Sequence, residues 1–450
     1  MNDTFMKTKP VFPLLVSMAL PNVISMLVNS LYNIVDSLFV AQINEQAMTA
    51  LSLVFPIQNF VNAVAIGFGV GINALVALYR GAGDHDKADA AATHGMALSV
   101  LHGLLCTLLA TAIMPGFLAR FTADSTIVSM GVTYSSIVFF FAIVNMASLA
   151  FEKIFQAVGR MKLTMLALIS GCVCNILLDP ILIFGLGMGV KGAAIATVLS
   201  QAVGAIWVIR FLTGPKTILK IRKEDMKLEG KIIMPVLALG ISTFVMLSTE
   251  SLLSISFSSS LARYGGDVAV GAMTVITSAS QLCTLPISGI CQGGQPVMSF
   301  NFGAGKRDRV KQAFRFQLTL CLSYTTIFWL LMMLVPGAVA GIFTSDASLI
   351  DYTTWAMRIY MAGIFSTGVQ IACQQSFMAL GQAKVSLLLA CLRKLILLIP
   401  LIFILPHVVA NPVFGVFLAE PVSDIIAAAV TATTFFLQFN KILDKGAGRV

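Results

Sequence analysis

Two stretches of the chain decide the fold: GFGVGINALVALYRGAGDHDK (residues 67–87) and GICQGGQPVMSFNFGAGKRDR (residues 289–309). Sliding the sequence on itself by 222 positions places Gly81-Ala82-Gly83 on Gly303-Ala304-Gly305 and Asp86 on Asp308. In both copies a glycine-containing apolar run ends in this small-residue turn and continues into a charged segment. The second half of the protein therefore repeats the first.

The same offset holds well beyond these stretches. Downstream, it places Phe121, Thr122 and Asp124 on Phe343, Thr344 and Asp346, and Phe155, Gly159 and Lys162 on Phe377, Gly381 and Lys384. Each half has six apolar runs, an even number, so the two copies have the same orientation and are related by an axis along the membrane normal. The repeat predicts two six-helix bundles that face each other across a central cleft. They are an N-terminal lobe (1–222) and a C-terminal lobe (223–450), with a basic hinge at 213–231.

The composition requires a membrane. Of the 450 residues, 58% are hydrophobic and only 11% are charged, whereas soluble domains carry about 25% charged residues. The runs are apolar on all sides, which excludes the alternating pattern of a membrane β-barrel. The sequence therefore predicts an all-α integral membrane protein with twelve transmembrane helices. The expected spans are 11–41, 47–78, 92–114, 126–157, 163–184, 190–212, 231–262, 268–301, 312–342, 351–380, 384–408 and 411–439.

The distribution of charge predicts the topology. There are 29 Lys and Arg against 20 Asp and Glu, a net charge of +9, and the excess lies in alternate loops. With both termini in the cytoplasm, the inner side receives the basic runs at 216–231 and 306–315, and the outer side keeps few basic residues. The positive charge is thus a topology signal, and no nucleic-acid partner is expected.

Motifs for other chemistry are absent or misplaced. The glycine patterns at 187–192 and 69–74 resemble dinucleotide fingerprints but follow no strand. The eight cysteines lie in apolar runs without metal-ligand spacing, and the four histidines are scattered. No nucleophile, base or histidine pair converges within the spans. We therefore expect neither an enzyme nor a cofactor.

Acids inside the spans are the most informative residues, because a charge in the hydrocarbon is costly and marks an ion or substrate pathway. Asp36 in the first helix and Asp179 in the fifth both fall in the outer half of the N-terminal lobe, and are expected to share a cavity. Tyr32 precedes Asp36 by one turn and Asn175 precedes Asp179 by one turn. Two such carboxylates repel, so either one holds a proton or a Na⁺ ion neutralises them. A structural hydrogen-bond network is the alternative.

Two further acids are candidates for substrate contact. Glu152 lies near the inner end of the fourth helix, next to Lys153 and close to Arg160, so pairing with a basic group competes with a functional role. Glu250 in the seventh helix falls on Val28 in the repeat and has no obvious cationic neighbour. This asymmetric acid is expected to contact substrate.

Two basic residues are candidates for structural ion pairs, and one proline is a candidate for a helix kink. Arg393 and Lys394 in the eleventh helix are expected to form structural ion pairs with Glu420 or Asp424. Pro21 lies fifteen residues before Asp36 and removes a helical hydrogen bond, which permits a kink. A change of charge at Asp36 would then bend the first helix.

Taken together, the two lobes, the repeated Gly-Ala-Gly loops, Pro21…Tyr32…Asp36 and Asn175…Asp179-Pro180 resemble the multidrug and toxic compound extrusion (MATE) family, specifically its bacterial multidrug branch. The resemblance covers essentially the whole chain. It implies that an inward-moving cation is exchanged for an outgoing organic cation.

The resemblance also implies residue roles. The cation-coupling site would comprise Tyr32, Asp36, Asn175, Asp179 and Thr197, with Pro21 as the bending point. Na⁺, if it is the ion, would bind at Asp36, Asn175 and Asp179. The candidate substrate contacts are Asp36, Glu152, Glu250 and Gln374. Some family members carry an acid in the tenth helix to pair with the acid of the seventh, whereas this chain has Gln370, Gln374 and Gln375 there.

The leading hypothesis is an antiporter, coupled to H⁺ or Na⁺, that exports organic, mostly cationic, drugs across the cytoplasmic membrane by alternating access. The 22 Met and 31 Phe residues suit soft, aromatic walls for varied apolar cations. A monomer in the lipid bilayer is expected. The main alternative is a lipid-linked sugar flippase of the same superfamily, which would need basic residues along its cleft. A major-facilitator transporter, an intramembrane enzyme and a receptor fit the sequence less well.

Overall fold

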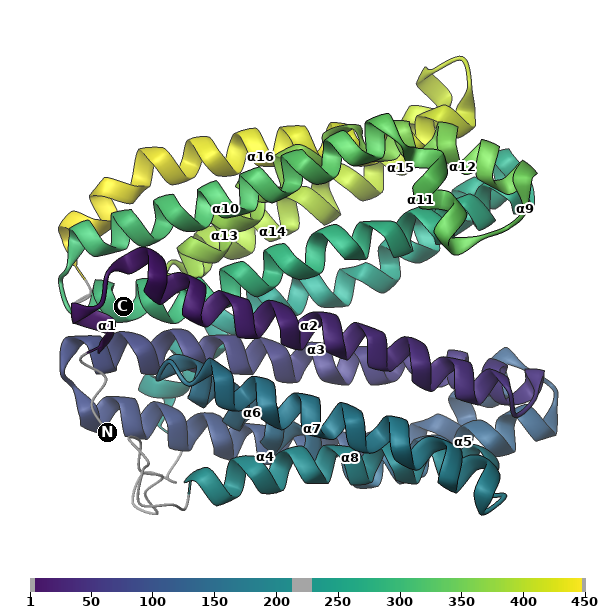
Figure 1. Ribbon diagram of the computed structural model, residues 1–450, viewed down its shortest axis with the longest axis horizontal. Coiled ribbons are helices and arrows are strands. Elements are labelled where there is room, and N and C mark those ends of the chain that lie inside the picture. Colours follow the sequence, from purple (N-terminus) through teal and green to yellow (C-terminus); the bar gives the residue numbers. More distant parts are fainter. Residues whose placement is uncertain (1–4, 213–228, 447–450) are drawn as a thin grey trace. The chain divides into compact units, whose positions relative to one another are not determined.

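The computed structural model describes residues 5–212 and 229–446, and the described chain is helical throughout, without strands (Figure 1). Most of the basic segment predicted as a hinge, and the predicted lobe boundary at 222/223, lie outside the described residues. The first half contains α1 (Phe5–Thr8), α2 (Val11–Ala41), α3 (Glu45–Ala82), α4 (His85–Phe121), α5 (Ser125–Phe140), α6 (Ala142–Ala157), α7 (Met161–Pro180), the π-helix η1 (Ile181–Gly185) and α8 (Gly189–Leu212).

The second half begins with α9 (Gly230–Gly303), in which two helices follow one another across a kink at Gly266. It continues with α10 (Arg307–Leu334), α11 (Pro336–Phe343), α12 (Ala347–Tyr360), the 3₁₀ turn η3 (Met361–Gly363), α13 (Ile364–Ala379), α14 (Ala383–Cys391), the π-helix η4 (Leu392–Leu398), α15 (Ile399–Val408) and α16 (Pro412–Lys445). Each of the twelve predicted spans falls on one or more of these helices.

Helix length supports membrane crossing. Within the described residues, nine helices are long and apolar enough to span a bilayer, and α5 with α6, bent by 50°, makes a tenth. The 74-residue α9 contains two predicted spans, joined at Gly266, where φ is 66°. The predicted span at 351–380 is divided between α12 and α13 by the turn η3. Breaks inside helices thus explain why fewer spans are evident than the sequence predicts.

The repeated sequence motifs have a local physical cause. Gly83 ends α3 with a φ of 83°, and Gly305 adopts a φ of 67° at the equivalent turn, a left-handed conformation that glycine tolerates best. Asp124 caps α5 by accepting a hydrogen bond from the Thr126 amide, and Asp346 caps α12 in the same way. The repeat therefore conserves helix ends.

Asp84 caps α4 and is held from two sides. Its side chain accepts a hydrogen bond from the Lys87 amide, and the Lys87 ammonium lies 2.8 Å from the other carboxylate oxygen. These contacts lower the pKa of Asp84 below its ordinary value. The charged residue that follows the Gly-Ala-Gly turn thus fixes the start of the next helix.

The chain separates into two compact units, and two helices pass from one to the other. Unit 1 comprises 1–9 and 24–244, and unit 2 comprises 10–23 and 245–450. The first part of α2 therefore belongs to unit 2 and the remainder to unit 1, while α9 does the reverse. The two changes of unit occur at nearly equivalent places in the repeat. At the offset of 222 residues, Val23 falls on Val245, one residue after Phe244, where α9 changes unit.

Close glycine contacts hold these exchanged segments. In unit 1, Gly67 and Gly71 of α3 pack against the backbone of α9 at Gly240 and Val236, where a Cβ atom would clash. In unit 2, a Cβ added at Gly289 would lie 2.7 Å from the side chain of Val23. The predicted role of Gly67 and Gly71 in close helix packing is confirmed.

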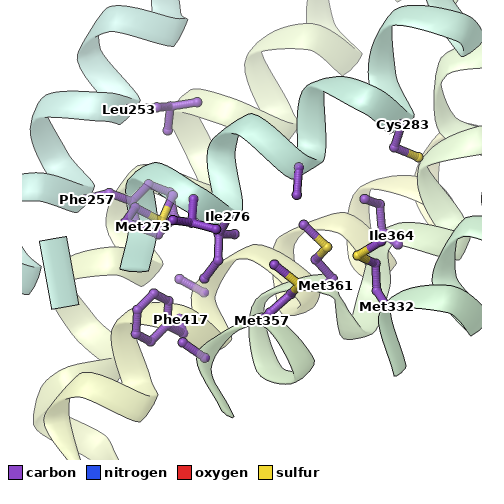
Figure 2. Close-up of a cluster of buried hydrophobic side chains, with 14 of the residues drawn as sticks. Leu253, Phe257, Met273, Ile276, Cys283, Met332, Met357, Met361, Ile364 and Phe417 are labelled. Carbon is purple, nitrogen blue, oxygen red and sulfur yellow. The ribbon is translucent and has the colours of Figure 1, made fainter. Parts of the chain in front are cut away.

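Each unit has its own apolar core. In unit 1 buried residues of α3, α4, α5 and α8 pack together, including Val54, Met114, Phe139 and Ala194. In unit 2 the larger cluster brings α9 against α10, α12, α13 and α16; Figure 2 shows its centre around Ile276, Met357, Met361 and Phe417. The side chains described below are positioned by these cores.

Gly71→Val should destabilise unit 1, because the new side chain would meet the carbonyl of Val236. Overpacking of this kind costs about 1–3 kcal/mol, so purified protein in detergent should melt several degrees lower. Gly116→Val is the matched control, since a Cβ at Gly116 meets nothing within 4 Å. Equal melting temperatures for the two variants would contradict the packing role.

Candidate cation site and substrate cavity

Unit 1 contains a cavity of about 660 Å³. Its walls come from α2, α3, α5, α6, α7 and α8, and carry an unusual number of amide side chains. The amide-bearing lining residues are Asn29, Asn33, Gln58, Asn59, Asn62, Asn145 and Gln201. Such amides both donate and accept hydrogen bonds, so the cavity can hold a polar guest within an apolar bundle.

The charged residues of the cavity wall are acids. Asp36 of α2 and Glu152 of α6 line it, and no Lys or Arg is among the lining residues in the described part of the chain. Negative charge with amide and hydroxyl oxygens favours a cationic guest over an anionic one.

The predicted pair of acids is brought together beside this cavity. The carboxyl groups of Asp36 and Asp179 lie within hydrogen-bonding reach of each other, and Asp179 is completely buried. Neither Asp179 oxygen, nor Oδ1 of Asp36, receives a hydrogen bond from a donor group in the described structure. A buried and a partly buried carboxylate that face each other with so few donors favour a proton or a cation between them.

The neighbours of the pair match most of the predicted site. Asn175 is fully buried, and neither its amide nitrogen nor its oxygen has a described partner. Tyr32 and Thr197 also line the cavity, close to the acids. The residues predicted for a cation site, from α2, α7 and α8, therefore converge.

Two residues of this cluster were not predicted. Tyr134 on α5 and Gln58 on α3 both line the cavity, and the Tyr134 hydroxyl lies near both acids. A tyrosine inside an apolar span is the signal that could have identified Tyr134. Gln58 lies among amides in α3 and becomes evident only when the helices are packed.

Glu152 combines the two roles that the sequence left open. It lines the cavity, accepts a 2.7 Å hydrogen bond from Gln156 and lies 3.5 Å from the ammonium of Lys153. Lys153 also donates to Gln156, at 3.1 Å. The side chain is 23% exposed, so a guest can reach it although it has a basic neighbour.

The other two candidate substrate contacts lie in unit 2. Gln374 is buried; it accepts a hydrogen bond from Gln370 and donates to the carbonyl of Ser386. Glu250 pairs with Lys394, so the expectation that Glu250 lacks a cationic neighbour is wrong. Lys394 and Ser386 belong to the eleventh predicted span, and spacing along one helix cannot reveal such contacts between helices.

The expectation that Arg393 and Lys394 pair with the acids of α16 holds for Arg393, whereas Lys394 pairs with Glu250. The Arg393 guanidinium lies 2.7 Å from Asp424 and 3.3 Å from Glu420. Pro21, the predicted bending point, lies inside α2, and the helix continues through it. The passage of α2 from unit 2 to unit 1 follows two residues later.

Comparison with known proteins agrees with this architecture. The MatE family pattern matches residues 21–181 and 242–404, which is most of the chain and both halves of the repeat. The chain belongs to the MatE family.

Curated relatives of this MatE protein match over nearly its full length. The multidrug export protein MepA of Staphylococcus aureus (strain N315) is 25% identical over 415 residues, which cover 91% of this chain and 90% of MepA. MepA of Staphylococcus haemolyticus (strain JCSC1435) is 24% identical, covering 91% of this chain and 89% of its own.

Solved structures show the fold. A crystal structure of MATE in the bent conformation matches with a TM-score of 0.93 at 23% identity, over 99% of each chain. The outward-facing conformation of a multidrug resistance MATE family transporter of the MOP superfamily matches with a TM-score of 0.92 at 23% identity, over 98% of this chain and 99% of that one. MATE structures have twelve helices in two bundles. The predicted fold class, that of a multi-pass membrane protein, is thus confirmed.

The facing acids generate a first expectation. Because Asp36 and Asp179 need a positive charge between them, the wild-type protein should be stabilised either by lower pH or by added Na⁺. Replacing both acids (Asp36→Asn with Asp179→Asn) should remove that dependence, since amides supply their own donors.

Thermal unfolding of purified protein across a pH series and a Na⁺ series measures this dependence. Asp351→Asn, a change at an exposed acid, is the control and should keep the wild-type response. An unchanged response in the double variant would show that the ion acts elsewhere.

Proposed function

We propose that this MatE protein is a cation-coupled antiporter that exports organic, mostly cationic, compounds across the cytoplasmic membrane. The observation that carries the proposal is the cavity of unit 1, whose charged lining residues are acids and which lies beside two facing buried carboxylates. The names of the MepA relatives add multidrug export. As in other MATE transporters, the protein needs neither a cofactor nor a chemical reaction for this activity.

The mechanism follows from competition for negative charge. Asp36 belongs both to the acid pair and to the cavity wall. A proton or Na⁺ held between Asp36 and Asp179, with Asn175 as a further oxygen ligand for Na⁺, neutralises the charge that an organic cation needs. Binding of the ion thus weakens binding of the guest, and each displaces the other. Tyr32, Tyr134 and Thr197 place further oxygen atoms on the cavity wall near the two acids.

Alternating access completes the cycle in this proposal. Helix α2 carries Asp36 in unit 1 and Pro21 in the segment assigned to unit 2. A change in the charge of Asp36 can therefore be transmitted along one helix to the weak point at Pro21. Both termini lie in the cytoplasm in this scheme, and the protein acts as a monomer.

A lipid-linked sugar flippase is the alternative of a different substrate class. It would need basic residues to hold a pyrophosphate, whereas the lining of the unit 1 cavity is acidic in the described residues. The electrostatics of the cavity therefore favour the export of cations.

Asp36→Asn should abolish export of a fluorescent cationic dye such as ethidium from whole cells, because the variant can neither exchange the ion nor attract the guest. Asp351→Asn, an exposed acid on α12, is the control and should export at the wild-type rate at equal expression. Full activity of Asp36→Asn would defeat the assignment of this residue.

Purified protein in liposomes should move the dye against an imposed gradient of either H⁺ or Na⁺. The ion whose gradient drives transport identifies the coupling ion, and Asp179→Asn should uncouple dye movement from that gradient. Dye movement that is driven by ATP, or that ignores both gradients, would refute antiport.

Glu152→Gln should weaken dye binding without abolishing ion coupling, since Glu152 lines the cavity apart from the acid pair. Loss of one charge contact in a polar site costs about 1 kcal/mol, so the dye concentration for half-maximal transport should rise about fivefold. An unchanged half-maximal concentration would restrict Glu152 to its structural pairing with Lys153 and Gln156.

A further inference from the structure

Unit 2 contains a cluster of five charged side chains from α9, η4 and α16: Glu250, Arg393, Lys394, Glu420 and Asp424. They are three carboxylates and two basic groups. Arg393 binds both acids of α16, at 2.7 Å from Asp424 and 3.3 Å from Glu420. Because Arg393 is paired with the two acids of α16, the basic group that contacts Glu250 is Lys394.

Lys394 is held as a buried ammonium. Its side chain is 5% exposed, and its Nζ atom donates to the Glu250 carboxylate and, at 2.8 Å, to the carbonyl of Met246 one turn earlier on α9. Burying an ammonium is costly unless oxygen atoms compensate it. The two oxygens of α9 thus form a ready-made receptor for a primary alkylammonium group, and a side chain of this protein fills it.

The two partners differ in accessibility. The Glu250 side chain is 59% exposed, in contrast to that of Lys394. A solute can approach the carboxylate, but the ammonium already there must leave before a second ammonium takes the same oxygens. Any cation that binds Glu250 in this way competes with Lys394.

The internal repeat places the two basic residues of this cluster where the first half lines its cavity. At the offset of 222 residues, Arg393 falls on Gly171 and Lys394 on Cys172, and both of those residues line the cavity of unit 1. Unit 2 thus carries a tethered cation at the position where unit 1 presents a neutral wall.

We propose that Lys394 is a tethered cation that holds Glu250 between binding events, and that a guest bearing a primary alkylammonium group binds Glu250 and Met246 by displacing it. The proposal rests on the proposed export of organic cations for its guest. It assigns to unit 2 an amine site distinct from the cavity that contains Asp36.

The test measures equilibrium binding of n-butylammonium, whose four-carbon chain matches the lysine stem, through its stabilisation of the purified full-length protein against heat. Lys394→Met removes the competing ammonium and keeps an unbranched apolar side chain. The half-maximal butylammonium concentration should fall about tenfold, equivalent to about 1.4 kcal/mol. Adding Glu250→Gln to this variant should abolish the gain.

Lys384→Met is the matched control, because Lys384 is an exposed lysine on the preceding helix α14; its response should equal that of wild type. An unchanged or weaker response of Lys394→Met would overturn the proposal and leave a purely structural ion pair. If Lys394→Met does not fold, Lys394→Gln serves in its place. If neither folds, Glu250→Gln alone must lose the butylammonium response of the wild type, and retention of that response refutes the site.

The binding test is independent of antiport. Repeating it in an Asp36→Asn background should leave the gain from Lys394→Met intact, because Asp36 belongs to unit 1. Loss of dye export in Asp36→Asn with no gain from Lys394→Met would refute the tethered cation and keep the proposed function. A gain from Lys394→Met with full dye export by Asp36→Asn would keep the tethered cation and refute the role of Asp36 in the proposed function.

Discussion

Close packing of helix backbones at glycines is the constraint on which the rest of the structure depends. In a bilayer the hydrophobic effect does not hold helices together, so their association depends on close van der Waals packing. Gly67 and Gly71 provide it for the first part of α9, and Gly289 and Gly293 provide it for the first part of α2. Both halves of the repeat thus have glycine contacts of the same kind. In each unit these contacts hold a helix whose remaining part belongs to the other unit. A side chain at these positions would separate backbones that now touch.

The packing also creates the polar interior. Once α2, α7 and α8 are held in one unit, Asp36, Asp179, Asn175 and Thr197 meet although they are far apart in sequence. The buried acids have no permanent basic partner in the described structure, which leaves their charge to an exchangeable ion. In unit 2 the opposite solution is found, because Arg393 pairs with the largely buried acids Glu420 and Asp424 from within the chain. The two copies of one ancestral design therefore treat buried negative charge differently.

This difference has a functional meaning in the proposed antiport. A site that must take up and release an ion cannot carry its own counter-ion, whereas a site that is stable when empty benefits from one. Unit 1 fits the first description and unit 2 the second. Glu152, with Lys153 and Gln156 beside it and the cavity in front, is intermediate: it is supported by its neighbours yet reachable by a guest.

The sequence by itself determined the helical membrane fold, the twelve spans, the internal repeat and the acids of the proposed cation site. Apolar length, helix-capping residues and the cost of a buried charge are local properties, so they can be read from neighbours along the chain. The tertiary structure alone decided that Tyr134 and Gln58 join the acids and that Lys394 rather than a solute faces Glu250. It also decided that α2 and α9 each divide between two units. These features depend on which faces of distant helices meet, and an apolar span, hydrophobic on every side, gives no periodicity from which that face can be predicted.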